Sequence, residues 1–315
     1  MAKILVTGAA GFIGSHLCRA LLERGDEVIG LDDFNDFYDP SIKEKNATQL
    51  QNPRFTLVRG SLLNDDIRAR AFAQNPEAVV HLAAWAGVRP SIKRPLHYQE
   101  QNVTGTAKML ESARLQKQKP KFIFASSSSV YGKNESVPFK ESDPVDHPIS
   151  PYAATKKAGE LLAYTYHHLY DLQVTCLRFF TVYGPGQRPD LAIHKFAKRM
   201  LAGKSIPKFG AGLSARDYTY VDDTVQGVIA ALDVCAGYHI YNIGNSETVT
   251  LNRLIETLEE VLGVRAIIDQ QPEQPGDVPL TFANIDLAQQ ALGYAPCTKL
   301  RAGLGKFAAW LEETS

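Results

Sequence analysis

The chain is poor in features that would assign it to several common classes of protein. Among 315 residues, Lys plus Arg and Asp plus Glu both number 34, so the formal net charge is zero. A balanced charge argues against a general nucleic-acid binder, which normally carries a basic excess. The four cysteines form no C-x-x-C pair, so we predict reduced thiols and no metal site. They are Cys18, Cys176, Cys235 and Cys297.

No stretch of the sequence has the composition of a membrane span or an export signal. No run approaches 18 apolar residues, so no spanning helix is expected. The N-terminus leads directly into the β-rich segment 3–7, without a charged region, an apolar core and a cleavage site. We therefore expect a cytoplasmic protein that contacts neither membranes nor nucleic acid. Its hydrophobic content of 44% is enough for a substantial core.

What the sequence does contain, through its first 180 residues, is an alternation of short apolar runs with helical patterns. Continuous apolar runs are typical of strands covered on both faces. Repeated β-α-β units predict a parallel sheet with helices on both sides. The predicted strands are 3–7, 27–31, 55–59, 78–82, 121–125 and 174–179. The predicted helices between them are 12–24, 64–74, 93–117 and 151–170.

The composition and the pattern of the sequence change after Phe180. Gly and Pro become dense, for example at 184–189, and the helical patterns that follow are separated by short strands and loops. We therefore predict a doubly wound α/β domain over residues 1–180 and a smaller C-terminal domain over 181–315. The segment 222–243 is expected to return to the first domain. The later helices are predicted at 190–202, 250–262, 285–291 and 299–312.

The first predicted strand ends in a glycine-rich segment, Gly8-Ala9-Ala10-Gly11-Phe12-Ile13-Gly14, which leads into a helix. Glycine permits a tight turn and close backbone approach, and the N–H groups of a helix start attract a pyrophosphate. The spacing is G-x-x-G-x-x-G instead of the commoner G-x-G-x-x-G. Asp32, at the end of the second strand, is placed to bond the ribose hydroxyls and to repel a 2′-phosphate. The motif predicts a Rossmann sheet that binds NAD in preference to NADP.

A catalytic arrangement is predicted where a serine run and a Y-x-x-x-K motif would meet. The run 126–129 follows the fifth strand, at the sheet edge where ligands bind in such folds. Tyr152 and Lys156 are at i and i+4 on a predicted helix, so they share one face. A free tyrosine has a pKa of about 10. A lysine cation and a positive nicotinamide ring would lower that pKa and make Tyr152 a base, while a serine hydroxyl orients the substrate alcohol.

Together these motifs resemble the extended short-chain dehydrogenase/reductase family, and the resemblance covers nearly the whole chain. A narrower similarity, to nucleotide-sugar enzymes and among them to UDP-glucuronate 4-epimerases, rests on five stretches. They begin at Asp32 (D-D-F-N-D-F-Y-D), His81 (H-L-A-A-W-A-G-V-R), Arg178 (R-F-F-T-V-Y-G-P), Arg216 (R-D-Y-T-Y-V-D-D) and Gln274 (Q-P-G-D-V-P). The resemblance implies a homodimer that converts UDP-glucuronate to UDP-galacturonate with NAD, through a transient 4-keto sugar.

The resemblance also implies roles for individual residues. The catalytic residues would be Ser127, Tyr152 and Lys156. The residues expected at the cofactor are Gly8, Gly11, Phe12, Ile13, Gly14, Asp32, Asn35, Ser61, Leu62, Leu82, Ala83, Ala84 and Asn102, together with Tyr152 and Lys156. The residues expected at the nucleotide sugar are Arg89, Ser128, Ser129, Thr181, Arg188, Lys195, Phe209, Arg216 and Asp277. Relatives usually carry an aspartate where Ser61 stands, although a serine hydroxyl can still bond adenine.

Four other functions stay open. A dehydratase of this type needs an acid pair beside the catalytic hydroxyl, where this chain has Ser128 and Ser129. Related decarboxylases carry a glutamate at the position of Ser129. Its absence favours epimerisation, because an anion there would oppose the substrate carboxylate and promote loss of CO₂. A neutral UDP-hexose 4-epimerase binds a sugar without a carboxylate, whereas Arg188 is expected to supply a cation to a substrate carboxylate. A non-catalytic NAD sensor would typically lack Tyr152 or Lys156.

Overall fold

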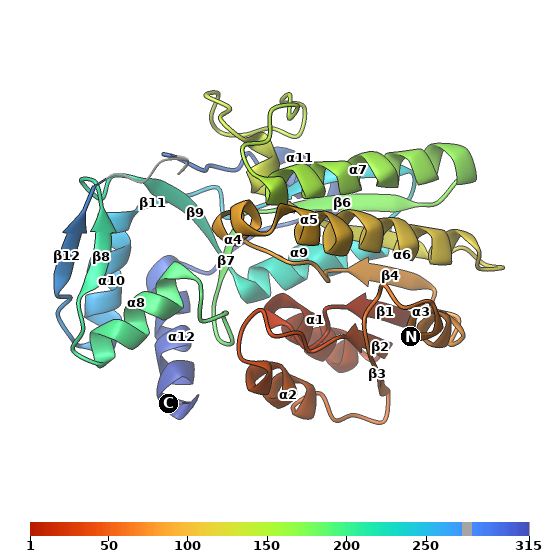
Figure 1. Cartoon of the computed structure of the whole chain (residues 1–315), viewed down its shortest axis with the longest axis horizontal. Coiled ribbons are helices and arrows are strands. Elements are labelled where there is room, and N and C mark those ends of the chain that lie inside the picture. The colour runs from red at the N-terminus through yellow and green to blue at the C-terminus, as the bar shows by residue number, and fades with distance from the viewer. Residues whose placement is uncertain (273–278, 315) are drawn as a thin grey trace.

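The structure is a computed structural model that describes residues 1–272 and 279–314, and its centre is a seven-stranded sheet (Figure 1). The strands lie in the order β3-β2-β1-β4-β5-β6-β10, so the order reverses between β1 and β4. All six strand pairs are parallel. The strands are β1 (Lys3–Thr7), β2 (Glu27–Asp32), β3 (Phe55–Arg59), β4 (Ala78–His81), β5 (Lys121–Ser127), β6 (Val174–Phe179) and β10 (Tyr238–Ile243). The predicted doubly wound α/β architecture is confirmed.

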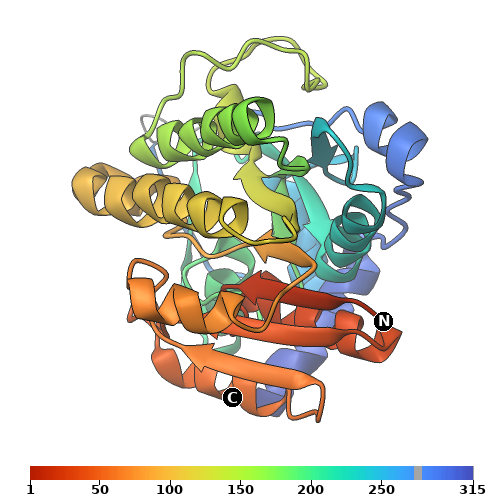
Figure 2. The same ribbon diagram turned by 90° about the vertical axis from the view of Figure 1, so that its right-hand side faces the viewer.

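Two apolar cores lie against the two faces of this sheet, because successive side chains of a strand point to opposite sides. In β1, Ile4 and Val6 belong to one core and Leu5 to the other. The first core includes residues of α1 (Phe12–Arg24) and α9 (Val221–Val234). The helices of the second core are α3 (Asp65–Phe72), α6 (Gly105–Arg114) and α7 (Pro151–Tyr170), and α6 and α7 lie side by side in Figure 2. Burial on both faces explains the continuous apolar runs.

The predicted helix 93–117 is wrong as a single element, because this part of the chain is built from short pieces. Pro95 cannot continue the hydrogen bonding of the preceding turn, so α4 ends before it and α5 begins at it. A π-helical segment then precedes α6. The pieces are α4 (Val88–Lys93), α5 (Pro95–Tyr98), the π-helix η1 (Gln99–Thr104) and α6 (Gly105–Arg114). Two further helices were not predicted. They are α2 (Pro40–Thr48), which the Asp39 side chain caps, and α9 (Val221–Val234), in the segment expected only to return to the first domain.

The chain after β6 builds a smaller lobe, seen on the left of Figure 1, and also returns to the sheet through α9 and β10. The lobe contains a three-stranded sheet, β7 (Thr181–Tyr183), β9 (Ala215–Tyr220) and β11 (Thr248–Thr250), and a parallel pair, β8 (Ile206–Phe209) and β12 (Ile268–Gln271). Its helices are α8 (Ala192–Leu201), α10 (Leu251–Leu262) and α12 (Leu300–Thr314), whereas α11 (Asp286–Leu292) packs on α9 and β10. The division of the chain into two domains at residue 180 stays a prediction. Within 1–272 and 279–314, no helix is long and apolar enough to cross a membrane.

Candidate active site

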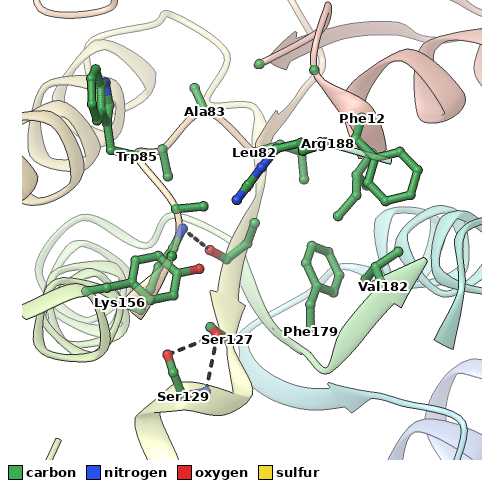
Figure 3. A pocket seen from close by; sticks show the side chains of 18 of the residues that line it. Phe12, Leu82, Ala83, Trp85, Ser127, Ser129, Lys156, Phe179, Val182 and Arg188 are labelled. Carbon is green, nitrogen blue, oxygen red and sulfur yellow. Dashed lines mark hydrogen bonds between the residues drawn. The ribbon is translucent and has the colours of Figure 1, made fainter. Parts of the chain in front are cut away.

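A cavity of about 520 Å³ opens at the carboxyl ends of the central strands, between the large sheet and the smaller lobe. It lies where the strand order reverses, which is where open α/β sheets bind their ligands. Figure 3 shows side chains of the sheet and of the lobe facing it. The predicted site residues that line it are Gly8, Gly11, Phe12, Ile13, Gly14, Asp32, Asn35, Leu62, Leu82, Ala83, Ala84, Ser127, Ser128, Ser129, Tyr152, Lys156, Thr181, Arg188 and Arg216.

Several predicted site residues lie elsewhere. The Asn102 side chain is buried behind the cavity wall, where it bonds the main chain of Trp85 and the hydroxyl of Thr155, so it supports the wall without lining it. The Ser61 hydroxyl accepts the N–H of Leu63. Outside the cavity lining are Ser61, Arg89, Asn102, Lys195 and Phe209. Arg89 lies over the Phe209 ring, at 5.6 Å from its centre, and Lys195 is exposed on α8. Asp277 lies outside the described residues.

The glycine loop after β1 has the shape that a pyrophosphate site needs. Gly8 has φ of 71°, a conformation that favours glycine. A Cβ at Gly14 would lie 2.0 Å from the Gly8 carbonyl oxygen, so no larger residue fits there without a shift of the backbone. The α1 helix starts after Gly11 without a side-chain cap. Its first N–H groups and its positive dipole end are therefore available to an anion.

Asp32 is held at the far end of this loop by the backbone. Its two carboxylate oxygens accept the N–H groups of Ala10 and Phe34, at 3.0 and 2.9 Å. Burial raises the pKa of Asp32, whereas these bonds and the charge of Lys43 lower it. Lys43 lines the same cavity and donates to the backbone and side-chain oxygens of Asn35, at 3.0 and 2.9 Å. Sequence reasoning missed Lys43, because it stands on the unpredicted α2. The loop and these polar groups suit the phosphates and the ribose of a dinucleotide.

The catalytic residues predicted from the serine run and the Y-x-x-x-K motif do meet at the cavity. Burial raises the pKa of Tyr152, while its hydrogen bond with Ser127 and the charge of Arg188 act in the opposite direction. Lys156 Nζ donates to the Ala125 carbonyl at 2.7 Å and lies 5.9 Å from the centre of the Tyr152 ring. Burial lowers the pKa of Lys156 to about 8. The pKa of Tyr152 is therefore raised overall, and the two groups that oppose the rise are Ser127 and Arg188, not Lys156 as predicted from the sequence.

The serine turn brings several hydroxyl groups to one side of the cavity. Ser127 Oγ accepts the backbone N–H of Ser129 at 3.2 Å and lies 3.0 Å from its hydroxyl. Ser128 and Ser129 begin the 3-10 turn η2 (Ser128–Tyr131), and Thr181 comes from the start of β7. All four hydroxyl residues line the cavity, and no acid stands beside Ser127 in this turn. The wall can therefore donate hydrogen bonds to an anionic substrate group.

A buried ion pair, not predicted from the sequence, lies directly beneath this turn. Arg178 of β6 donates through Nε and Nη2 to the carboxylate of Glu160, at 2.9 and 3.0 Å, and both side chains are 1% exposed. Ser126, adjacent to Ser127, donates to the same carboxylate at 2.6 Å. Glu160 stands on α7 one turn beyond Lys156. Glu160 therefore ties the helix of Tyr152 to β6 through Arg178 and to the strand of Ser127 through Ser126, at a site where an unpaired charge would be costly.

Two arginines bring positive charge to the cavity from the smaller lobe. Arg188, in the loop after β7, reaches towards the middle of the cavity (Figure 3). Arg216 of β9 donates to the backbone oxygens of Ala215 and Pro279, at 2.9 and 3.4 Å. An arginine held by neutral acceptors keeps its full charge for a phosphate or carboxylate. Among the described residues, no group of three or more His, Cys, Asp or Glu is arranged to hold a metal ion.

Comparisons with known proteins agree with this geometry. The model of the NAD dependent epimerase/dehydratase family matches residues 4–244. The chain is 46% identical to UDP-glucuronate 4-epimerase 4 of Arabidopsis thaliana, covering 98% of this chain and 74% of that protein. It is 43% identical to Protein CapI of Staphylococcus aureus, covering 99% and 98%.

Among solved structures, the chain resembles the UDP-glucuronic acid 4-epimerase of Bacillus cereus in complex with UDP-glucuronic acid and NAD. The TM-score is 0.93 at 38% identity, and the match covers 99% of this chain and 100% of that one. The motifs, the sheet topology and the matched sequences all point the same way. The chain therefore belongs to the NAD dependent epimerase/dehydratase family, a group of extended short-chain dehydrogenases/reductases.

Proposed function

We propose that this protein converts UDP-glucuronate to UDP-galacturonate by NAD-dependent epimerisation at C4. The observation that carries the proposal is the joint presence, in one cavity, of the Ser127, Tyr152 and Lys156 group and of a hydroxyl-lined wall without an acid. The names of the relatives support the same substrate, since the Arabidopsis thaliana and Bacillus cereus proteins are UDP-glucuronate 4-epimerases. The fit of the glycine loop and of Asp32 to a dinucleotide supports NAD as the cofactor.

The residues of the chain divide the chemistry between them. Bound NAD would accept the hydride of the sugar C4 and later return it. Tyr152 would take the proton of the 4-hydroxyl, with Ser127 hydrogen-bonded to both the phenol and the alcohol. Lys156, fixed by the Ala125 carbonyl, keeps a donor beside the phenol. Arg216 would hold the diphosphate while the 4-keto sugar turns, so that hydride returns to the other face.

The hydroxyl wall has a specific task in this scheme. Oxidation of UDP-glucuronate at C4 makes a β-keto acid, which loses CO₂ when its carboxylate C–C bond aligns with the carbonyl π-system. An epimerase must hold the carboxylate in another orientation. Ser128, Ser129 and Thr181 are donors that would bond the anion and keep it charged, and Arg188 would add a cation.

The proposal is tested by the products that the purified protein forms. It is incubated with NAD and, separately, with UDP-glucuronate, UDP-glucose and UDP-N-acetylglucosamine, and the sugars are identified by NMR while CO₂ is measured. We expect UDP-galacturonate as the dominant product, little CO₂, and slower conversion of the neutral sugars. A UDP-pentose as the main product would contradict epimerisation, and a preference for UDP-glucose would contradict the proposed substrate. Either result would leave the hydride-transfer site intact.

The proposal includes a homodimer in the cytoplasm, with a dinucleotide domain up to residue 180 and a nucleotide-sugar domain after it. The support for the dimer is an apolar surface on α7 and at the end of α6, the two neighbouring helices of Figure 2. Its residues are Leu115, Leu161, Tyr164 and Leu169, exposed by 64%, 56%, 51% and 60%. We infer that a second copy of the chain covers these side chains. Light scattering at micromolar concentration should give twice the chain mass of 34.7 kDa, and a monomeric mass would contradict it.

A further inference from the structure

Arg188 does not reach the cavity as a free side chain, because a neighbouring carboxylate fixes its orientation. Its Nε and Nη2 groups donate to Oδ1 and Oδ2 of Asp190, at 2.9 and 2.8 Å. The guanidinium also lies over the ring of Phe37, at 5.1 Å from its centre. The Arg188 side chain is only 17% exposed. A planar guanidinium held by a two-bond pair and an aromatic face keeps one orientation.

The pair with Asp190 leaves the guanidinium a second edge for binding. Arginine has five N–H groups in one plane. Asp190 uses the Nε hydrogen and one Nη2 hydrogen, so one hydrogen of Nη2 and both hydrogens of Nη1 are left. No acceptor among residues 1–272 and 279–314 bonds Nη1. This Nη1–Nη2 edge has the spacing that accepts the two oxygens of another carboxylate.

The loop that carries the pair is itself fixed to both halves of the molecule. His16, on the helix α1 that follows the glycine loop, has its Nε2 atom 2.9 Å from the Pro185 carbonyl oxygen. The Gln187 side chain donates to the Val182 carbonyl, and the backbone carbonyl oxygen of Gln187 lies 2.6 Å from His194 Nδ1. The backbone on either side of Arg188 is therefore anchored. Removal of the Asp190 partner would release mainly the Arg188 side chain.

The charge of Arg188 reaches the atoms where the reaction takes place. Arg188 lines the same cavity as Tyr152, the residue proposed to take the proton of the sugar 4-hydroxyl, and its charge opposes the rise that burial causes in the pKa of Tyr152. In a glucuronate ring the C6 carboxylate is attached to C5, the neighbour of C4. A cation within reach of Tyr152 is therefore within reach of that carboxylate, and its orientation decides whether the contact forms.

We propose that Asp190 is a positioning residue that determines specificity for the sugar acid. It holds Arg188 so that the Nη1–Nη2 edge faces the C6 carboxylate, and it does not itself touch the substrate. This inference rests on the proposed function. It differs from the hydroxyl wall, which would bond the carboxylate directly, because Asp190 acts only through the geometry of another side chain.

The test measures binding of sugar nucleotides instead of turnover. NAD-loaded protein carrying Tyr152→Phe is titrated by calorimetry with UDP-glucuronate and with UDP-glucose, alone and combined with Asp190→Asn, Arg188→Ala or both. Asn keeps one acceptor oxygen but loses the charge and the two-bond pair. Glu256→Gln breaks the exposed Arg253–Glu256 pair of the same lobe and is the matched control. The variant Asp190→Glu tests rescue, since it restores the carboxylate.

The expected result is a selective loss. Asp190→Asn should weaken UDP-glucuronate about tenfold, as for a misplaced charged hydrogen bond, and UDP-glucose less than about twofold. The double variant should be no weaker than Arg188→Ala, and Asp190→Glu should recover part of the affinity. Equal losses for both sugars, or no loss for either, would overturn the role of Asp190. If Arg188→Ala itself does not discriminate between the sugars, the proposed carboxylate contact of Arg188 fails instead.

Discussion

The two sides of the cavity are built by different means. On the cofactor side, the polar groups come from residues at strand ends, and the backbone holds them in place. The backbone of Gly14 packs closely against that of Gly8, and two backbone N–H groups bind the Asp32 carboxylate. On the substrate side, Arg188 comes from a loop and Arg216 from β9. Side chains or carbonyls hold them, as Asp190 holds Arg188. A site held by backbone leaves a motif in the sequence, whereas a site held by side-chain partners does not.

Substitution of Tyr152, where the two sides meet, should have the largest effect. Tyr152→Phe removes the proton acceptor and should lower turnover by about 10²–10⁴-fold, with NAD affinity unchanged. The measurement is the rate of UDP-galacturonate formation, alongside calorimetry with NAD. Tyr164→Phe, on the exposed face of the same helix, is the control and should keep normal turnover. Near-normal activity of Tyr152→Phe would remove the proposed base.

The cofactor side alone is tested at Asp32. Asp32→Ala removes the ribose acceptor and the anion that repels a 2′-phosphate, so NAD affinity should fall about 100-fold, as expected for two hydrogen bonds to a charged group. Discrimination against NADP should relax in the same variant. Calorimetry with both cofactors measures the change, with the exposed Asp66→Ala as control. A wild-type protein that binds NADP better than NAD would contradict this assignment of Asp32.

Substitution of Lys156 should show how much the buried catalytic amine lowers the free energy of unfolding. Burial lowers the pKa of Lys156 from 10.5 to about 8. Below pH 8, Lys156 is therefore protonated in both the folded and the unfolded chain, and the buried charge lowers the free energy of unfolding by its full amount. Between about pH 8 and pH 10.5 the folded chain loses the proton first, and stability rises with pH. Lys156→Met should raise the free energy of unfolding at pH 7 by about 2 kcal/mol, allowing about 1 kcal/mol for the lost hydrogen bond.

That gain should shrink as the pH approaches 10, while turnover is lost at every pH. Urea unfolding at pH 7 and pH 10 checks the sign, and Lys204→Met, at an exposed position, should show neither effect. A lower free energy of unfolding for Lys156→Met at pH 7 would contradict this prediction, because it would mean that the buried lysine stabilises the fold.

The smallest effect is expected on the substrate side, at the hydroxyl wall. Ser129→Glu places an anion beside the substrate carboxylate, and the repulsion between like charges should lower epimerisation about tenfold, which corresponds to about 1.4 kcal/mol. The share of UDP-pentose should rise. NMR of the products and measurement of CO₂ give both numbers. Ser129→Gln has nearly the same size without the charge and should release less CO₂. Equal CO₂ release by the two variants would show that charge does not direct the reaction.

The difference between groups held by the backbone and groups held by side-chain partners also explains how much of the structure could be predicted from the sequence. The six predicted strands all appear, with ends within two residues, because burial on both faces leaves continuous apolar runs. The glycine loop, Asp32 and the Tyr152–Lys156 spacing are local patterns with a direct structural meaning. The π-helix η1 and the helix α2 have no such pattern.

Contacts between distant segments were the ones that sequence reasoning missed. The Glu160–Arg178 pair joins α7 to β6, and Lys43 meets Asn35 only because α2 folds back on the loop after β2. Asp190 lies in the same Pro- and Gly-rich loop as Arg188, but nothing in the sequence indicates that their side chains form a pair. The residues Asn102, Lys195 and Phe209 were assigned to the site by resemblance, and the structure leaves them outside the cavity wall.

The return of α9 and β10 to the large sheet limits how such an enzyme can evolve. A chain cut after residue 180 would lack the strand that pairs with β6 and the helix that packs on α1. Its sheet would end in a row of unpaired N–H and C=O groups beside an uncovered apolar face, which favours aggregation. Transfer of the sugar-binding lobe without α9 and β10 therefore needs more than one junction, because these two elements lie between segments of the lobe.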